Sequence, residues 1–329
     1  MSDVIDLSEE LREFKETGRN KKTMKINDHE HLEIGKFDVI LMNAPYQPPV
    51  DRSREEAKRG TGRRRACGSR NTLWPRFVKL GLRLCKDDGH CAFIHPPLWR
   101  KPGHALWPVL SPLIRYLEMH DAGDGKATFG AQIRYDWYVL DKAKNGGPAV
   151  VVDQDGNRRE MDLSEWSWLP SGMFDDFRTI LAGDGDDRLE VLYSRSRHAH
   201  DRAGTSSIKS GTFPHPCIHA LHKSGGVKLY YASSKSEFFV PKVILCEGGF
   251  PYPMIDAEGA YGLTEYCFAI RVGSEDEAAK IKAAIESDRF KEMLSVAKWS
   301  AFRTEHAMFS YFRRDFWLQF LDDERREAA

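Results

Sequence analysis

The chain has 329 residues, of which 41% are hydrophobic and 30% charged, a composition typical of a globular protein with a buried core. Its formal net charge is zero, so support for a nucleic-acid partner has to come from local clusters of charge rather than from the chain as a whole. No stretch approaches the roughly 18 apolar residues of a membrane span, and the N-terminus has no apolar signal-peptide core. Residues 1–23 are polar, and we expect a separate N-terminal segment there.

Residues 24–145 have the pattern of an α/β domain. Residues 24–34 predict a short strand and a turn. Phe37–Met42 is an apolar run of strand length, which we interpret as the central strand of a parallel sheet. Residues 47–72 are rich in Pro, Arg and Gly without periodicity, which predicts a long surface loop.

A helix, further strands and a second helix follow this loop. Apolar residues at spacings of four, three and four predict an amphipathic helix over residues 73–85. We expect strands at 91–94, 114–120 and 134–140, and a helix at 104–113. This order is that of the later half of a doubly wound α/β sheet with an antiparallel edge.

The pattern changes after residue 145. Residues 146–188 predict a hairpin, Ala149–Val152 with Arg158–Met161, and then a linker at Gly183–Asp187. Residues 189–320 combine short β-like runs with one strong amphipathic helix at Glu275–Leu294, which predicts an α+β C-terminal domain.

The tetrapeptide Asn43-Ala44-Pro45-Tyr46 closes the first apolar run. An Asn side chain and a backbone carbonyl can accept the two hydrogens of an exocyclic amino group, and a tyrosine ring can stack on a base taken out of its helix. A proline stiffens the turn that holds these groups together. The tip therefore predicts a site for methylating an amino group.

Several stretches resemble one enzyme family. Residues 36–47, K-F-D-V-I-L-M-N-A-P-Y-Q, resemble the catalytic motif of the amino-group DNA methyltransferases, and most closely that of the restriction–modification adenine methylases with an N-P-P-Y-Q tip. Residues 72–78, 88–100 and 136–140 are similar to the helix and strands that follow this motif, and residues 205–317 more loosely to a target-recognition region.

The resemblance implies a fold and an activity. The fold is α/β, a partial Rossmann-like methyltransferase sheet with a C-terminal α+β target-recognition domain. The activity is the transfer of a methyl group from S-adenosyl-L-methionine to N6 of a flipped adenine in double-stranded DNA. The implied catalytic residues are Asn43, Ala44, Pro45 and Tyr46, and the implied cofactor-binding residues are Asp28, Phe37, Asn43 and Phe77.

Two features depart from the family pattern. Ala44 stands where the family has proline; it keeps the backbone carbonyl but not the rigidity. The Gly-rich turn that binds the methyl donor normally precedes the catalytic strand, and no candidate precedes it here. Downstream, Val243–Phe250 is the one candidate, and the prolines that follow it argue against the helix that such a turn requires.

Basic residues next to the tip suggest contacts with DNA phosphates. The loop can also be read as an ordinary solvated segment, but its position beside the tip favours phosphate contact. The residues that we expect to bind DNA are Arg59, Arg63, Arg64, Arg65, Arg70 and Arg100.

No metal site is expected. Asp28-His29-Glu30-His31 is read as a polar strand edge, and the six cysteines contain no C-x-x-C pair, which favours reduced thiols. We expect a cytoplasmic protein, associated with the nucleoid if its source is prokaryotic, and as further partners a second subunit or a restriction nuclease. The main alternative function is a catalytically inactive methyltransferase-like module that binds DNA; a weaker one is a methyltransferase acting on RNA or protein.

Overall fold

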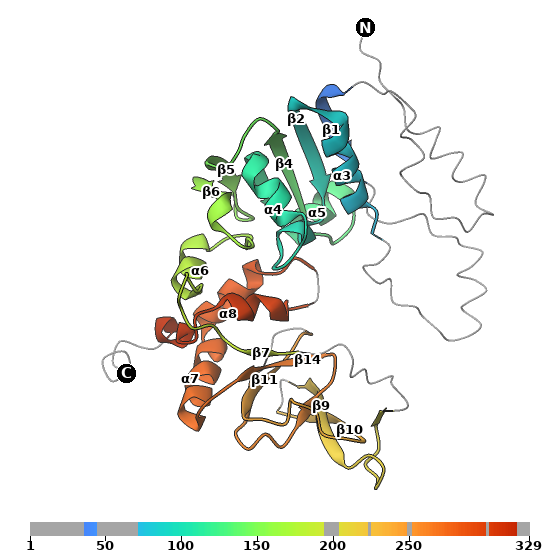
Figure 1. Ribbon diagram of the computed structural model, residues 1–329, viewed down its shortest axis with the longest axis vertical. Coiled ribbons are helices and arrows are strands. Elements are labelled where there is room, and N and C mark those ends of the chain that lie inside the picture. The colour runs from blue at the N-terminus through green and yellow to red at the C-terminus, as the bar shows by residue number, and fades with distance from the viewer. Residues whose placement is uncertain are drawn as a thin grey trace, which may run out of the picture. The chain divides into compact units, whose positions relative to one another are not determined.

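The structure is a computed structural model, and it describes residues 36–44, 72–193, 204–222, 225–248, 252–300 and 303–320 (Figure 1). The chain divides into two compact units, Met1–Lys36 and Phe37–Ala329, and the elements below belong to the second. The strand and turn predicted at 24–34, most of the loop predicted at 47–72 and the N-terminal segment lie outside the described residues. In the described ranges, no helix is both long and apolar enough to cross a membrane.

The first sheet contains the tip. Within the described residues it has six strands in the order β1-β2-β4-β3-β5-β6. The pairs β1/β2 and β3/β5 are parallel and the others antiparallel. The strands are β1 (Phe37–Asn43), β2 (Cys85–His95), β3 (Ile114–His120), β4 (Tyr135–Asp141), β5 (Pro148–Val152) and β6 (Arg158–Asp162).

The structure corrects the predicted position of the first apolar run. β1 is an edge strand of the described sheet, not a central one. Ile40 and Met42 on one face pack against the main core, but Val39 and Leu41 on the other face are 57% and 77% exposed. A continuous apolar run is typical of a strand that is buried on both faces. Here the described residues cover only one face of β1.

Helices cover the face of the sheet that carries Met42 and Phe93. α3 (Trp74–Leu84) packs so closely that a Cβ on Gly81 would lie 2.8 Å from the Phe93 ring and 3.3 Å from Met42. The sequence predicted this helix correctly. The helix predicted over 104–113 is instead two short pieces, each with a proline in its first turn. The other helical elements between α3 and β5, whichever face they cover, are η3 (Pro97–Arg100), α4 (Trp107–Leu110), η4 (Ser111–Leu113) and α5 (Ala122–Phe129).

The predicted hairpin is present, but it belongs to the first sheet. β5 pairs antiparallel with β6 and parallel with β3, so the hairpin extends the sheet. It is followed by η5 (Leu163–Glu165) and α6 (Phe174–Ile180).

Residues after 188 form two more sheets in the described part of the chain, each with four strands, in the orders β13-β9-β10-β8 and β12-β11-β14-β7. The mixed α/β class expected from the sequence is confirmed. The strands are β7 (Val191–Leu192), β8 (Thr205–Ser206), β9 (His215–Leu221), β10 (Val227–Ala232), β11 (Lys242–Cys246), β12 (Met254–Asp256), β13 (Gly262–Leu263) and β14 (Cys267–Arg271).

The long helix predicted at 275–294 is two helices, α7 (Glu275–Glu286) and α8 (Asp288–Val296). Ser287 between them has extended backbone angles, and its side chain accepts a hydrogen bond from the Phe290 N–H. A serine cap thus ends one helix and begins the next, although the apolar spacing continues through it. Two short helical segments follow, η6 (His306–Tyr311) and η7 (Phe316–Phe320).

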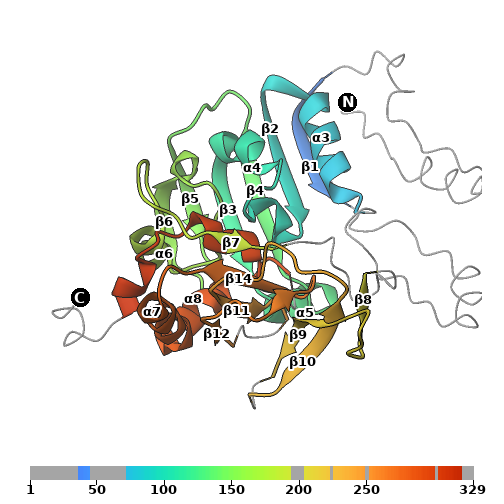
Figure 2. The same cartoon turned by 60° about the horizontal axis from the view of Figure 1, so that its bottom comes forward.

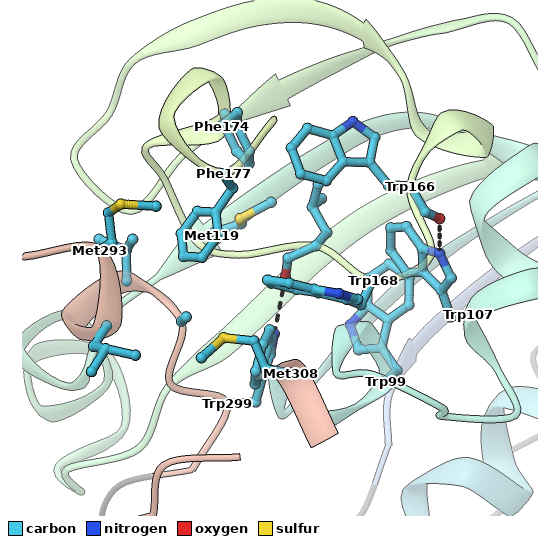
Figure 3. Close-up of a cluster of buried hydrophobic side chains, with 14 of the residues drawn as sticks. Trp99, Trp107, Met119, Trp166, Trp168, Phe174, Phe177, Met293, Trp299 and Met308 are labelled. Carbon is cyan, nitrogen blue, oxygen red and sulfur yellow. Dashed lines mark hydrogen bonds between the residues drawn. The ribbon is translucent and has the colours of Figure 1, made fainter. Parts of the chain in front are cut away.

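One large hydrophobic core contains side chains from the first sheet and from the C-terminal elements. Figure 2 shows α8 lying near α6, the helix that follows the first sheet in the chain. Trp168 contacts Phe177 and Trp299 edge to face, each at 5.4 Å between ring centroids. The Trp299 indole N–H donates to the Leu169 carbonyl at 3.0 Å, and Figure 3 shows these rings packed together. The segment that follows α8 is therefore anchored against the segment that follows β6.

Candidate active site at the end of β1

The end of β1 fixes the backbone of the tip. The Ala44 N–H donates to the Ile94 carbonyl at 3.3 Å, which continues the parallel ladder one residue beyond Asn43. Ala44 is buried and Asn43 is exposed. The chain therefore presents the Asn43 amide to solvent from a backbone that the sheet holds in place. Pro45 and Tyr46 lie outside the described residues.

The edge of the sheet at which β1 ends, which crosses the ends of several strands, also carries polar and aromatic side chains from the neighbouring strands. Asn43 pairs with Ile94, His95 with Asp136, and Tyr135 with His120. The tip is thus one end of a row that crosses β1, β2, β4 and β3.

A buried stack of rings supports this edge from the core side. Trp74, at the start of α3, stacks on His95 at 4.3 Å and on His104 at 5.7 Å between ring centroids. The His95 Nδ1 lies 2.9 Å from the Pro96 carbonyl, and Nε2 lies 2.6 Å from the Tyr138 hydroxyl. A carbonyl can only accept, so Nδ1 carries the proton and Nε2 accepts from Tyr138.

Burial keeps this histidine neutral. Desolvation lowers the pKa of His95 to about 4, and it also lowers the pKa of His104 to about 4. The pKa of Tyr138 is raised by burial, so its hydroxyl stays protonated as the donor. His95 is the last residue of β2, the strand that pairs with β1, and its ring is fully buried between Trp74 and Tyr138.

Arg100 does not take the role that the sequence predicted. It is 1% exposed, and its guanidinium donates to both oxygens of Asp136 at 2.7 and 2.9 Å. Its other donors reach the carbonyls of Leu169 and Pro170 and the Ser171 hydroxyl. The expectation that Arg100 binds DNA is wrong for this structure, because a buried guanidinium with every branch engaged cannot reach a phosphate.

The other predicted site residues are divided between described and undescribed segments. Asp28 and the basic loop residues Arg59, Arg63, Arg64, Arg65 and Arg70 lie outside the described residues. Phe77 is half-buried on α3, one turn after Trp74, near the tip end of that helix. Phe37 begins β1 and is six residues from Asn43, about 20 Å along the strand. The structure therefore does not bring Phe37 to the tip.

The described residues contain no fitting cradle for S-adenosylmethionine. Val243–Gly248, the described part of the candidate Val243–Phe250, is not one, because β11 pairs antiparallel on both sides. The turn from β3 into α5 is rich in glycine but already filled: Asp121 accepts from the N–H groups of Gly123 and Asp124, and a Cβ on Gly125 would meet the Ile133 carbonyl at 1.8 Å. A carboxylate at that helix end opposes a second anion.

The aromatic contacts at this edge of the sheet were not predicted from the sequence. Tyr135 stacks on His120 at 4.4 Å and meets the partly exposed Phe129 edge to face at 4.9 Å. The helix α5 that carries Phe129 was not predicted either. Its start had a usable signal, because Asp121 followed by small residues is a typical N-cap.

The part of the chain that carries the tip matches a known family. The family model of the Eco57I restriction-modification methylases matches residues 3–106. This span includes β1, α3 and β2 and reaches the histidine stack behind the tip. A search among curated proteins gave no match.

Solved structures of restriction–modification enzymes are also similar to this chain. The type I restriction-modification methyltransferase subunit from Streptococcus thermophilus is 22% identical, with 38% of this chain and 28% of that chain covered and a TM-score of 0.26. The type IIL enzyme MmeI in complex with DNA is 9% identical, with 83% and 46% covered and a TM-score of 0.46. The type IIG restriction endonuclease BpuSI is 10% identical, with 90% and 48% covered and a TM-score of 0.33. This chain thus spans less than half the length of each.

Proposed function

We propose that this chain is a DNA adenine-N6 methyltransferase of the restriction–modification type, using S-adenosyl-L-methionine. The observation that carries the proposal is the exposed amide of Asn43, held at the end of a parallel-paired strand beside the buried backbone of Ala44. This tip lies within the residues that match the methylase family model. The described residues form the acceptor side of such a site, within a partial Rossmann-like sheet.

The proposed chemistry needs few groups from the protein. The Asn43 side-chain carbonyl would accept one hydrogen of the adenine amino group. The backbone carbonyl of Ala44, a residue that is buried in this structure, would accept the other once it is uncovered. These two acceptors would hold the amino group in place and make its nitrogen more nucleophilic, and S-adenosyl-L-methionine, when bound, would supply the methyl group. Tyr46 stacks on the flipped base. No strong base is required, since the proton can leave after the methyl group has been transferred.

DNA is the proposed partner of the rest of the chain. Residues 189–320 would read the target sequence, and the basic loop that contains Arg63, Arg64 and Arg65 would contact phosphates beside the flipped base. A restriction nuclease or a second subunit is the proposed protein partner.

A second function is favoured by one observation. The described residues form no donor cradle, so the chain could serve as a methyltransferase-like DNA-binding subunit whose donor site is completed by another chain. In that case Asn43 and Ala44 would still receive the base, but the isolated chain would not bind the donor.

The test uses the full chain, radiolabelled S-adenosylmethionine and a mixed-sequence DNA duplex. We expect the label in DNA, and in N6-methyladenine after digestion to nucleosides. Label in another base would contradict adenine specificity. Calorimetry with S-adenosylmethionine separates the two functions: donor binding with methyl transfer supports the enzyme, and DNA binding without donor binding supports the subunit.

A further inference from the structure

Two cysteines face each other on neighbouring strands of the sheet β12-β11-β14-β7. Cys246 ends β11 and Cys267 begins β14, and the two residues lie directly opposite each other in the antiparallel register (Figure 1). Their sulfur atoms are 3.2 Å apart, and both side chains are buried. Neither cysteine is in a disulfide, so the structure holds a pair of thiols at this position.

The backbone at the pair is that of a non-hydrogen-bonded position of the ladder. The hydrogen bond is made one position further on, where the Glu247 N–H donates to the Tyr266 carbonyl at 3.0 Å. Residues opposite each other at a non-hydrogen-bonded position have Cα atoms about 4.5 Å apart. A disulfide spans Cα separations of about 4.4 to 6.8 Å. The two sulfur atoms can therefore bond through side-chain motion, with the strands left in register.

The pair lies where the two C-terminal sheets pack on each other. Cys246 and Cys267 belong to a hydrophobic cluster that also contains Ile218 of β9 and Leu263 of β13. The Leu221 N–H, at the end of β9, donates to the Cys246 sulfur at 3.2 Å. The Cys246 sulfur thus accepts a hydrogen bond from one sheet while it faces the Cys267 thiol within the other.

The two thiols differ in their chemistry. The hydrogen bond from Cys267 lowers the pKa of Cys246 against the effect of burial, and the Leu221 N–H lowers it further. The same hydrogen bond, together with burial, raises the pKa of Cys267. Cys246 is also the more accessible of the two, at 7% exposed against 0% for Cys267. Because the thiolate is the reactive form of cysteine, Cys246 is the residue that an oxidant meets first.

We propose that Cys246 and Cys267 are a site of reversible oxidation, which a hydroperoxide converts to a disulfide. The Cys246 thiolate attacks the peroxide, the O–O bond breaks, and Cys246 becomes a sulfenic acid as hydroxide leaves. The Cys267 sulfur then attacks the sulfenic sulfur, the S–O bond breaks, and that oxygen leaves as water. Both sulfurs are oxidised and the peroxide is reduced. With hydrogen peroxide and the two thiol protons, the products are one disulfide and two water molecules.

A dithiol reductant reverses the reaction by thiol–disulfide exchange. The site lies within residues 189–320, the region proposed to read DNA. It rests on the contacts of the two cysteines alone, so it stands whether or not DNA is the partner of that region.

The experiment maps disulfides in the reduced full chain before and after treatment with hydrogen peroxide. Remaining thiols are alkylated in denaturant, and the digested peptides are identified by mass spectrometry without reduction. We expect a peptide pair that joins Cys246 to Cys267 after treatment and that disappears with dithiothreitol. Treated wild-type protein that lacks this link would overturn the proposal.

Single variants test the order of the two steps. In Cys267→Ser, peroxide should leave Cys246 as a sulfenic acid, which dimedone labels when it is added with denaturant after catalase has removed the peroxide. In Cys246→Ser, Cys267 should stay unlabelled, because it is fully buried and its pKa is raised. Equal labelling of the two variants would contradict the assigned roles.

The matched control is Cys217→Ser. It removes one buried thiol from β9 and leaves the pair intact, so the Cys246–Cys267 link should form as in wild type. Links from Cys217 to either member of the pair, in a yield equal to that of the Cys246–Cys267 link, would show unselective oxidation and would overturn the site. Circular dichroism checks that each variant folds, and the wild-type map decides the proposal even if one does not.

Discussion

The protonation of His95 is coupled to the stability of the folded protein. Its ring is held between Trp74 and Tyr138 in the neutral form. A histidine whose pKa is lowered on folding binds a proton more readily in the unfolded chain. Acid therefore favours unfolding, and the effect begins at the unfolded pKa, near 6.5.

We predict that the free energy of unfolding falls as the pH is lowered from about 6.5 to about 5, by about 1.4 kcal/mol per pH unit for the fully buried His95 and by less for the partly exposed His104. The pKa of each is lowered to about 4, so neither takes up its proton in the folded protein within this window. Urea unfolding across the window measures the slope. His104→Gln should remove the part of this slope that His104 contributes. A free energy of unfolding that does not change with pH in the wild-type protein would show that these rings are not buried as neutral groups.

The sequence identified the tip but not what lies behind it. Asn43 and Tyr46 could be recognised because their chemistry is local to a short motif. Arg100 could not be placed, since a Trp-Arg pair after a strand has the same pattern whether the guanidinium faces solvent or, as here, a buried Asp136 from β4. Burial of a polar residue depends on partners distant in sequence, and residue type alone does not reveal it.

β1 is an element with one covered face. Ile40 and Met42 pack against the core, whereas Leu41 and Val39 face solvent. In the described sheet β1 pairs with β2 only. An apolar run that looks like a central strand can therefore stand at the edge of the described part of a sheet.

We predict that Leu41→Lys changes the free energy of unfolding by no more than about 0.5 kcal/mol, because the side chain is 77% exposed. Ile40→Lys, one position away, should cost more than about 2 kcal/mol, because it puts a charge against the core. Urea unfolding of both variants makes the comparison. Equal losses would mean that the outer face of β1 is covered as well as the inner one.

Other elements show where periodicity is sufficient and where it is not. The helix α3 follows its apolar spacing closely and was predicted. The break at Ser287 was not predicted, because the apolar spacing continues through it. The Ser287 side chain caps the start of α8, and the extended backbone at this residue ends α7. The hairpin β5/β6 was visible in its turn residues, but its pairing with β3 is a long-range contact that local pattern does not encode.

The molecule from Phe37 onward is organised around a continuous core. Side chains from the first sheet, from α6, from β11 and β14 and from α7 and α8 belong to one cluster. The end of the sheet that carries Asn43 and the region proposed to read DNA therefore pack on one shared core.

We propose that the end of β1 receives the amino group to be methylated. The most direct test of this proposal is methyl transfer by Asn43→Ala beside wild type, with DNA affinity measured on the same samples. We expect a loss of at least about a hundredfold in transfer rate, because an acceptor that orients the nucleophile is removed. We expect DNA affinity to stay within about twofold of wild type. Transfer at the wild-type rate by Asn43→Ala would show that the tip is not the active site.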